Sequence, residues 1–345
     1  MKKTVFAIVI VLTLTISAIS VSALSVEEAF DFKEFSHDGL ILPYRLYVPE
    51  DYNAENEYPL VVFLHGAGER GRDNDLQLKN AVQTLFDRED GLMSNSIVIA
   101  PQCPENEQWV DTPWADGNYS TDEIPESNEL AAVVALVDSM AKEYSIDKAR
   151  IYAMGVSMGG FGTWDLITRH NDIFAAAAPI CGGGDPSKAE LLINTPIYTF
   201  HGTADNSVPY EGTAEMVEAL EDIGSRLINF ITYDGEGHGI WEMASAEADW
   251  LEWLYEQKLT DRYPEIDETE ADTETEAPEI TDTDAASDSV QSESAITTEP
   301  SPESDKTDER ESNENNFPIW IIAIIAAVII ALGIIIFSKK KGNKE

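Results

Sequence analysis

A serine stands at the apex of a sharp strand-to-helix turn near the middle of the chain. It is Ser157, in the stretch Gly-Val-Ser-Met-Gly at 155–159, which follows the mostly apolar run 149–154 and precedes the helix-compatible segment 160–169. Small residues on both sides allow a tight turn and a close approach of strand and helix, so the stretch predicts a nucleophile elbow. A serine hydroxyl is a weak nucleophile near pH 7, and it therefore needs a histidine base and an orienting carboxylate.

The base and the acid are expected in two later loops. Asp205 follows the expected strand 196–200, and His238 follows the expected strand 227–233 inside a glycine-rich loop. Loops at the carboxyl ends of parallel strands meet at one edge of an α/β sheet, so both can converge on Ser157. Asp234 or Glu236 could replace Asp205, but both lie close to His238 in sequence. None of the chain's other histidines occupies a corresponding position: His37 in a polar turn before the first strand, His65, His170 and His201.

Acyl transfer also needs backbone donors for the developing oxyanion. The run 59–64 has the apolar pattern of a buried strand, and the glycine-rich segment 65–71 follows it. The expected donors are the N–H groups of Met158 and Ala67, with Gly68 as an alternative to Ala67. His65 and His201 are expected to be structural histidines that bond loop backbone.

These segments together resemble a known family. The chain resembles the α/β-hydrolase esterases related to carbohydrate esterase family one, the dienelactone-hydrolase-like enzymes and the prolyl-oligopeptidase catalytic domain. The resemblance covers about residues 37–258 and rests on His-Gly-Ala-Gly-Glu-Arg-Gly at 65–71, Ala-Pro-Gln-Cys-Pro at 100–104, the elbow at 155–160, Pro-Ile-Cys-Gly-Gly-Gly-Asp at 179–185, His-Gly-Thr-Ala-Asp at 201–205 and Gly-His at 237–238.

The resemblance implies an α/β-hydrolase fold, with a mostly parallel sheet and helices on both faces. It implies ester hydrolysis through an acyl-enzyme on Ser157, with His238 as general base and then general acid, and it implies neither a cofactor nor a metal. Dienelactone hydrolases use a cysteine nucleophile, so Ser157 favours the esterase or peptidase branches. The alternatives are a serine peptidase of the prolyl-oligopeptidase type and a non-catalytic glycan-binding surface protein, although an intact triad argues against the latter.

The outer segments predict where the enzyme works. Residues 1–23 combine Lys2 and Lys3, an apolar run and a small-residue end, which is typical of a secretory signal peptide. Residues 319–337 carry no charge and are long enough to span a bilayer as one helix. Lysines dominate the tail 338–345, and the positive-inside rule keeps them cytoplasmic. We therefore expect a single-pass membrane protein at the cell surface, with an extracellular catalytic domain at 24–260.

A linker is expected between that domain and the anchor. Residues 261–316 hold 20 acidic and 3 basic side chains among many Ser, Thr and Pro residues, a composition that predicts an extended, disordered stalk. Calcium binding is the weaker alternative, because no glycine-containing twelve-residue calcium loop is present.

The net charge of the chain limits the classes of partner that it can bind. The net charge is −42, to which the signal peptide, linker and tail contribute +2, −17 and +3, leaving −30 for residues 24–260. Such a surface repels nucleic acid and other polyanions. It favours a neutral substrate, such as plant polysaccharide carrying acetyl or feruloyl groups, or another small ester. The oligomeric state cannot be derived from the sequence.

Three tryptophans and two cysteines complete the candidates. Trp109 and Trp114 lie in a loop after the expected fourth strand, and Trp241 follows His238 closely, so all three are candidate substrate contacts; packing the loops onto the sheet is the equal alternative. Cys103 and Cys181 are expected after the fourth and sixth strands, with two strands between them. That separation favours buried thiols over a disulfide.

Overall fold

The computed structural model describes residues 25–88 and 91–262, which form one eight-stranded sheet with helices on both faces. The strand order is β1-β2-β4-β3-β5-β6-β7-β8. The first two strands form an antiparallel hairpin, β2 pairs antiparallel with β4, and all further pairs are parallel. The strands are β1 Asp31–His37, β2 Leu40–Tyr47, β3 Tyr58–Leu64, β4 Ile97–Pro101, β5 Ile146–Val156, β6 Ala176–Ile180, β7 Ile197–Gly202 and β8 Ile228–Tyr233.

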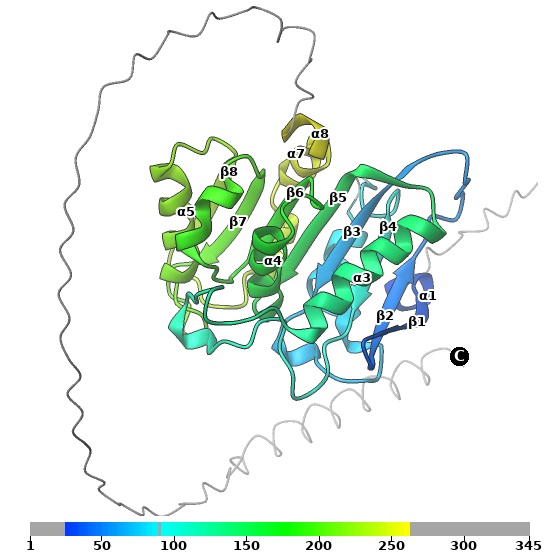
Figure 1. Cartoon of the computed structure of the whole chain (residues 1–345), viewed down its shortest axis with the longest axis horizontal. Coiled ribbons are helices and arrows are strands. Elements are labelled where there is room, and N and C mark those ends of the chain that lie inside the picture. The colour runs from blue at the N-terminus through cyan, green and yellow to red at the C-terminus, as the bar shows by residue number, and fades with distance from the viewer. Residues whose placement is uncertain (1–24, 89–90, 263–345) are drawn as a thin grey trace, which may run out of the picture. The chain divides into compact units, whose positions relative to one another are not determined.

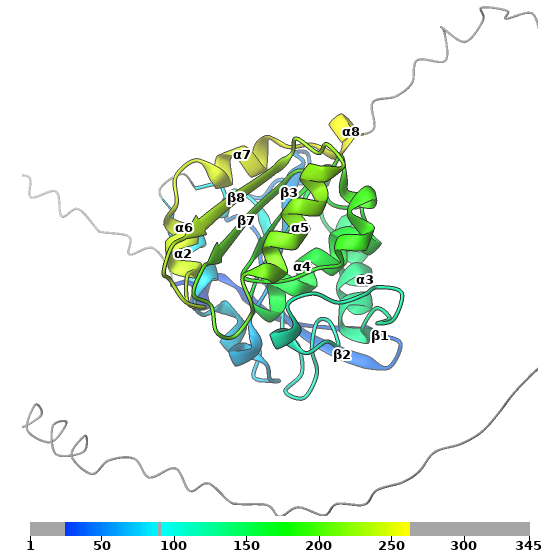
Figure 2. The same cartoon turned by 90° about the vertical axis from the view of Figure 1, so that its left-hand side faces the viewer.

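Helices cover the two faces in separate layers, as Figures 1 and 2 show. One layer consists of α3 Asn128–Glu143, α4 Met158–Arg169 and α5 Glu211–Asp222. The other consists of α1 Val26–Ala29, α2 Ala81–Phe86, α6 Trp241–Ala246, α7 Trp250–Glu256 and α8 Leu259–Arg262. The loops contain short 3₁₀ turns at Ala67–Glu69, Leu76–Leu78, Trp114–Asp116 and Pro186–Leu192.

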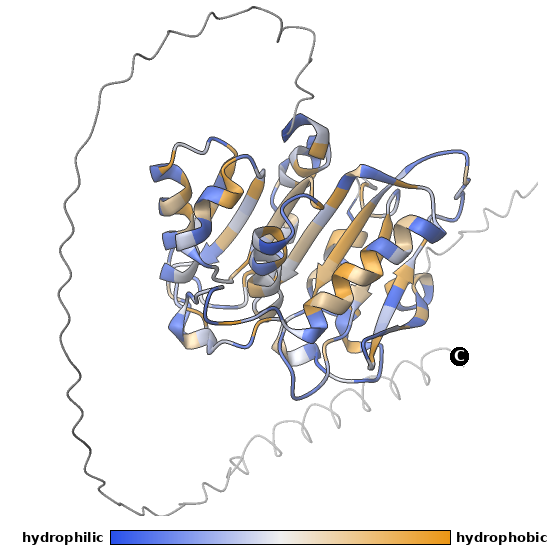
Figure 3. Ribbon diagram, viewed as in Figure 1, coloured by the Kyte–Doolittle hydropathy of each residue, from blue (hydrophilic) through white to orange (hydrophobic). Residues whose placement is uncertain are grey.

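Each face of the sheet has its own apolar core, because successive side chains of a strand point to opposite faces. In β3, Leu60, Val62 and Leu64 join the core beneath α3, α4 and α5. Val61 and Phe63 join the core beneath the second layer. Figure 3 shows the strands as largely hydrophobic and the outward sides of the helices as largely hydrophilic. A sheet covered on both faces explains why the central strands are apolar over most of their length and do not alternate with polar residues.

The strands and helices on which the site was expected all form. The runs 59–64 and 149–154 lie in β3 and β5, the runs 196–200 and 227–233 begin one residue before β7 and β8, and 160–169 lies in α4. Cys103 and Cys181 are buried free thiols, with β3 and β5 between the strands that they follow, so the prediction of unpaired cysteines is confirmed.

Two boundaries differ from the expectations. His37 ends β1 instead of preceding the first strand, because Asp31–His37 pairs with β2 although its side chains are mostly exposed or half-buried. The catalytic domain extends beyond residue 260: Arg262 is 6% exposed and donates hydrogen bonds to Phe174 O (2.6 Å) and Thr195 Oγ1 (2.7 Å).

The predicted signal peptide, membrane helix and basic tail, and the linker beyond Arg262, lie outside the described residues. Within 25–88 and 91–262, no helix combines the length and the apolar character that a membrane crossing requires.

Candidate active site

Ser157 occupies a strained turn between β5 and α4. Its φ of 57° and ψ of −118° are rare for a residue with a side chain. The flanking glycines are needed for space: a Cβ on Gly159 would stand 2.0 Å from Leu64 O, and a Cβ on Gly155 would stand 2.3 Å from Gly159 O. The close approach of helix and strand that the sequence predicted is therefore what holds Ser157 at the apex.

The three side chains expected to act together form one hydrogen-bonded chain. His238 Nε2 lies 2.7 Å from Ser157 Oγ, and His238 Nδ1 lies 2.6 Å from Asp205 Oδ2. The carboxylate can only accept, so Nδ1 carries the proton and Nε2 accepts from the serine hydroxyl. Asp205 is thus the partner of His238, whereas the alternative Asp234 accepts from Thr203 Oγ1 (3.2 Å).

The Asp205 carboxylate is held in its charged form by several donors. Burial opposes its ionisation, but hydrogen bonds from His201 and His238 and from the N–H groups of Val208 (3.0 Å) and Ser207 (2.8 Å) outweigh that cost. The pKa of Asp205 is therefore held well below its ordinary value. A carboxylate that stays ionised can orient the imidazole and stabilise the imidazolium that forms when His238 takes a proton.

The expected oxyanion donors belong to two segments that adjoin the serine. Met158 is the first residue of α4, where N–H groups have no acceptor within the helix and the helix dipole favours negative charge. The loop after β3 lies against Ser157, because a Cβ on Gly66 would stand 3.6 Å from Ser157 Cβ. Ala67 and Gly68 both line the pocket beside the serine, and the choice of Ala67 over Gly68 stays a prediction.

A buried histidine fixes that loop. His65 Nε2 accepts from Cys103 N–H (2.9 Å), so Nδ1 carries the proton and donates to Gly66 O (2.6 Å). Trp109 Nε1 donates to His65 O (3.0 Å). Burial lowers the pKa of His65 to about 4, which keeps the ring neutral at physiological pH. His65 thus bonds loop backbone, as the sequence suggested.

A pocket of about 350 Å³ opens above the serine. Its lining comes from the loops after β3, β4, β5, β7 and β8 and from the starts of α2 and α6: Gly66, Ala67, Gly68, Glu69, Asn80, Trp114, Val156, Ser157, Ser207, Val208, His238 and Trp241.

The three candidate tryptophans have different positions. Trp114 is half-buried and lines the pocket, and Trp241 lines it with its ring edge-on to His238 at 5.7 Å. Trp109 is fully buried in the core and packs against His65, so the expectation that it contacts a substrate directly is corrected. Its loop reaches the pocket through Trp114, whereas its own indole holds the backbone at His65.

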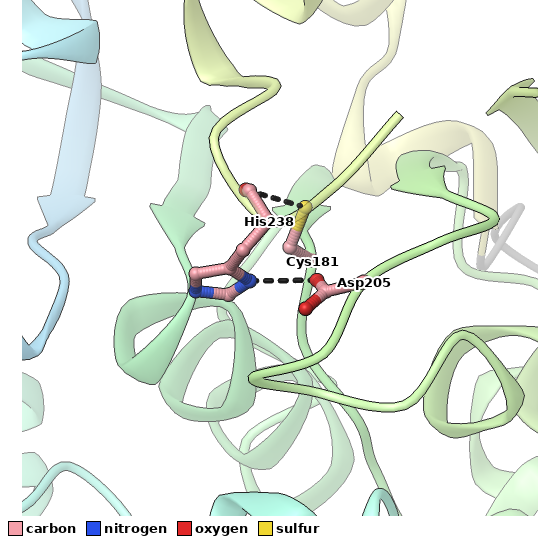
Figure 4. A group of neighbouring side chains, drawn as sticks. All are labelled: Cys181, Asp205 and His238. Atoms are coloured by element: carbon pink, nitrogen blue, oxygen red, sulfur yellow. Dashed lines mark hydrogen bonds and ion pairs between the residues drawn. The ribbon is translucent and has the colours of Figure 1, made fainter. Parts of the chain in front are cut away.

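One further group of possible metal ligands is found among the described residues, and it overlaps the triad. Figure 4 shows Cys181 beside His238 and Asp205; the ligand atoms of all three lie within 4.8 Å of one another. The Cys181 Sγ–H donates weakly to His238 O (3.6 Å), and burial raises the pKa of this thiol far above its ordinary value. His238 Nδ1 and Asp205 Oδ2 already bond to each other. We therefore interpret Cys181 as a contact that holds the loop of His238, and not as a metal ligand.

Sequence reasoning missed several pocket residues. Glu69 was visible in the segment 65–71, but nothing in that stretch showed that it would line the pocket of the serine. Asn80 gave no signal, because an asparagine ahead of a six-residue helix looks like an ordinary helix start. Ser207 and Val208 follow Asp205 too closely for sequence to separate a structural turn from a pocket wall.

Comparison with known proteins places this geometry in a family. The phospholipase/carboxylesterase family matches residues 52–249, which is more than half of the chain. The chain belongs to this family. The resemblance to α/β-hydrolase esterases inferred from the motifs is thereby confirmed.

The individual proteins that match this chain share only part of its sequence. A protein of Aspergillus niger named "Probable feruloyl esterase C" is 25% identical over 182 residues, which cover 51% of this chain and 59% of that protein. A bifunctional acetylxylan esterase/xylanase of Neocallimastix patriciarum is 29% identical over 178 residues, covering 51% and 23%. The crystal structure of a thermostable esterase is 37% identical with a TM-score of 0.61, covering 68% and 64%. The chain therefore spans less than two thirds of each of these proteins.

Proposed function

We propose that this chain is a serine esterase that hydrolyses carboxylic esters through an acyl-enzyme on Ser157. The observation that carries the proposal is the unbroken hydrogen-bonded chain from Ser157 Oγ through His238 to the ionised Asp205. Family membership supports the same reaction class.

The geometry gives each group one role in acylation. Ser157 Oγ attacks the ester carbonyl carbon while its proton passes to His238 Nε2. The carbonyl oxygen becomes an oxyanion, for which the N–H groups of Met158 and Ala67 are the proposed donors. The carbon–oxygen bond to the alcohol then breaks, and His238 returns the proton to the departing alcohol oxygen.

Deacylation repeats these steps with water as the nucleophile. His238 Nε2 takes a proton from water, and the resulting hydroxide adds to the acyl carbon. Collapse of the second oxyanion breaks the bond to Ser157 Oγ, which recovers its proton from His238. The products are a carboxylic acid, the alcohol and the unchanged enzyme.

The proposed substrates are acetyl or feruloyl esters of plant polysaccharide. Two relatives bear names of enzymes acting on such esters, and the pocket combines two indole rings with polar groups that could hold a sugar or an aryl group. The acidic charge of the domain also favours a neutral polymer over a polyanion.

The test is hydrolysis of acetylated xylan, methyl ferulate, p-nitrophenyl acetate and a prolyl-peptide anilide by the wild type and by Ser157→Ala. We expect ester turnover that falls by at least about a thousandfold in the variant. Cleavage of the anilide alone would show that the protein is a peptidase and not an esterase. Ester turnover that survives the substitution would refute the proposed nucleophile.

We also propose that the enzyme works outside the cell, held by a helix at 319–337. The support is the sequence alone: the leader at 1–23, the uncharged run and the lysines behind it. Deleting residues 319–345 should move esterase activity from the membrane fraction to the medium. Activity found only in the cytosol in both cases would contradict this location.

A further inference from the structure

A carboxylate that the proposed reaction does not use lines the same pocket as the nucleophile. Glu69 ends the 3₁₀ turn Ala67–Glu69, on the loop that supplies the proposed oxyanion donor, and it lines the pocket. The position of a Cβ on Gly66 is a common reference point: Glu69 Oε2 lies 3.1 Å from it and Ser157 Cβ lies 3.6 Å from it. The carboxylate and the serine therefore border the same small space.

An asparagine from another segment fixes this carboxylate. Asn80 Nδ2 donates to Glu69 Oε1 at 2.6 Å. Asn80 stands at the start of α2 with a φ of 61° and a ψ of −121°, close to the strained values of Ser157. Such backbone conformations persist where the surrounding structure requires them, and they cluster at functional sites. Because α2 packs against α6, Asn80 and Trp241 lie at the starts of two neighbouring helices and both line the pocket.

A negative charge on the Glu69 carboxylate works against the reaction unless a further donor, beyond those of the protein, partly neutralises it. An anion near a developing oxyanion raises the energy of the transition state. Burial already raises the pKa of Glu69, although backbone N–H groups and Asn80 partly compensate. A carboxylate has about four lone-pair sites, so the N–H groups of Glu69 and Gly66 and the Asn80 amide leave it room for one further donor. A substrate group that donates a hydrogen bond to Glu69 would offset both the burial of the carboxylate and its repulsion of the oxyanion.

We propose that Glu69, oriented by Asn80, is a specificity residue that accepts a hydrogen bond from a hydroxyl group beside the scissile ester. The inference rests on the proposed esterase function and deepens it: the preferred alcohol is a sugar or another polyol with a free hydroxyl next to the acylated one. Such a hydroxyl lies three bonds from the ester oxygen and hence near Ser157. The phenolic hydroxyl of a feruloyl group lies much farther away, beyond its ring, and a carboxylated acyl group would be repelled.

Matched esters test this on the full chain. One pair is trans-2-hydroxycyclohexyl acetate and cyclohexyl acetate, which differ only in the neighbouring hydroxyl. The other is methyl 4-hydroxycinnamate and methyl cinnamate, which differ only in the phenolic hydroxyl. We expect kcat/KM of the wild type to favour the hydroxylated acetate by roughly tenfold, as for a hydrogen bond to a charged group. Glu69→Gln should bring that ratio close to one and leave the cinnamate ratio unchanged.

Two further variants separate recognition from a structural role. Asn80→Gly accepts the strained backbone and removes the donor that orients the carboxylate, so it should lower the acetate ratio in part. Glu105→Gln changes an exposed carboxylate in the loop after β4 and should keep the wild-type ratio.

The outcomes distinguish this inference from the esterase proposal. A Glu69→Gln protein that loses rate on both acetates equally, or in which only the cinnamate ratio changes, overturns the hydroxyl subsite while Ser157-dependent turnover stands. A wild type without preference within the acetate pair overturns it as well. Absence of Ser157-dependent turnover on every ester would instead remove the proposed function itself.

Discussion

Asp205 accepts hydrogen bonds from two histidines, and only one of them touches the serine. His238 Nδ1 lies 2.6 Å and His201 Nε2 lies 3.2 Å from the same oxygen, Oδ2. His201 is fully buried; its Nε2 also lies 3.1 Å from Val208 O, which requires a proton on that nitrogen, and its Nδ1 lies 2.7 Å from Thr213 Oγ1. His201 therefore ties the catalytic carboxylate to α5, and we infer that it is a positioning residue that acts through Asp205.

Replacing His201 should change how the reaction depends on pH. In His201→Ala, Asp205 loses one donor and becomes a stronger base toward His238, so we expect kcat to fall by about 10- to 100-fold and the acid limb of the pH–kcat/KM profile to move to higher pH. His201→Gln can still offer an N–H and should restore part of both effects. A purely structural role would lower the rate without moving the acid limb, and pH–rate profiles of the three proteins decide between the two.

The loop after β3, which carries the proposed oxyanion donor, is an element whose shape depends on one neutral histidine. His65 accepts from Cys103 N–H at Nε2 and donates to Gly66 O at Nδ1, so a second proton on Nε2 would break the first of these bonds. Burial lowers the pKa of His65 from 6.5 to about 4. Between pH 6.5 and about 4, the unfolded chain therefore binds a proton at His65 that the folded protein does not bind.

The protein should lose stability on acidification through this window. The contribution of His65 is fully present above pH 6.5 and is lost as the pH falls to 4, by about 3 kcal/mol of unfolding free energy. Other groups titrate in the same range, so the control is His65→Gln, which is less stable at pH 7 but lacks this titration. Urea unfolding of both proteins at pH 7, 5.5 and 4 should show the difference between them shrinking. A constant difference would contradict the neutral buried ring.

The same elements show what could be predicted from the sequence. Largely apolar runs and flanking glycines identified β3, β5, β7 and β8, and the parallel-sheet rule then brought Ser157, Asp205 and His238 to one edge. The exposure of Trp109 could not be derived in this way, because a tryptophan in a loop can turn inward or outward with the same neighbours in sequence. Asn80 was equally hidden, since its role depends on a strained backbone and on Glu69, eleven positions earlier in the chain.

The last described helix, α8, completes the folded unit. The second apolar core includes Trp250, Leu251 and Leu254 of α7, and the partly buried Leu259 of α8 packs against it. Arg262 then reaches back to Phe174, which precedes β6, and to Thr195, which precedes β7. The acidic composition that predicted a linker from residue 261 misplaced this boundary, because Asp261 and Arg262 look like the linker but belong to α8.

This closure predicts the shortest fragment with full stability. A protein ending at residue 260 loses both Arg262 hydrogen bonds and leaves the buried Phe174 carbonyl without that donor, which should cost about 3 kcal/mol and lower Tm by roughly 6–12 °C. A fragment ending at residue 266 should retain the stability, and Arg262→Met in that fragment should behave like the shorter protein. Because the substitution changes one side chain at constant length, it separates the arginine contacts from any effect of shortening the chain. Equal Tm values for 24–260 and 24–266 would show that α8 does not stabilise the sheet, and the catalytic unit would then end at residue 260.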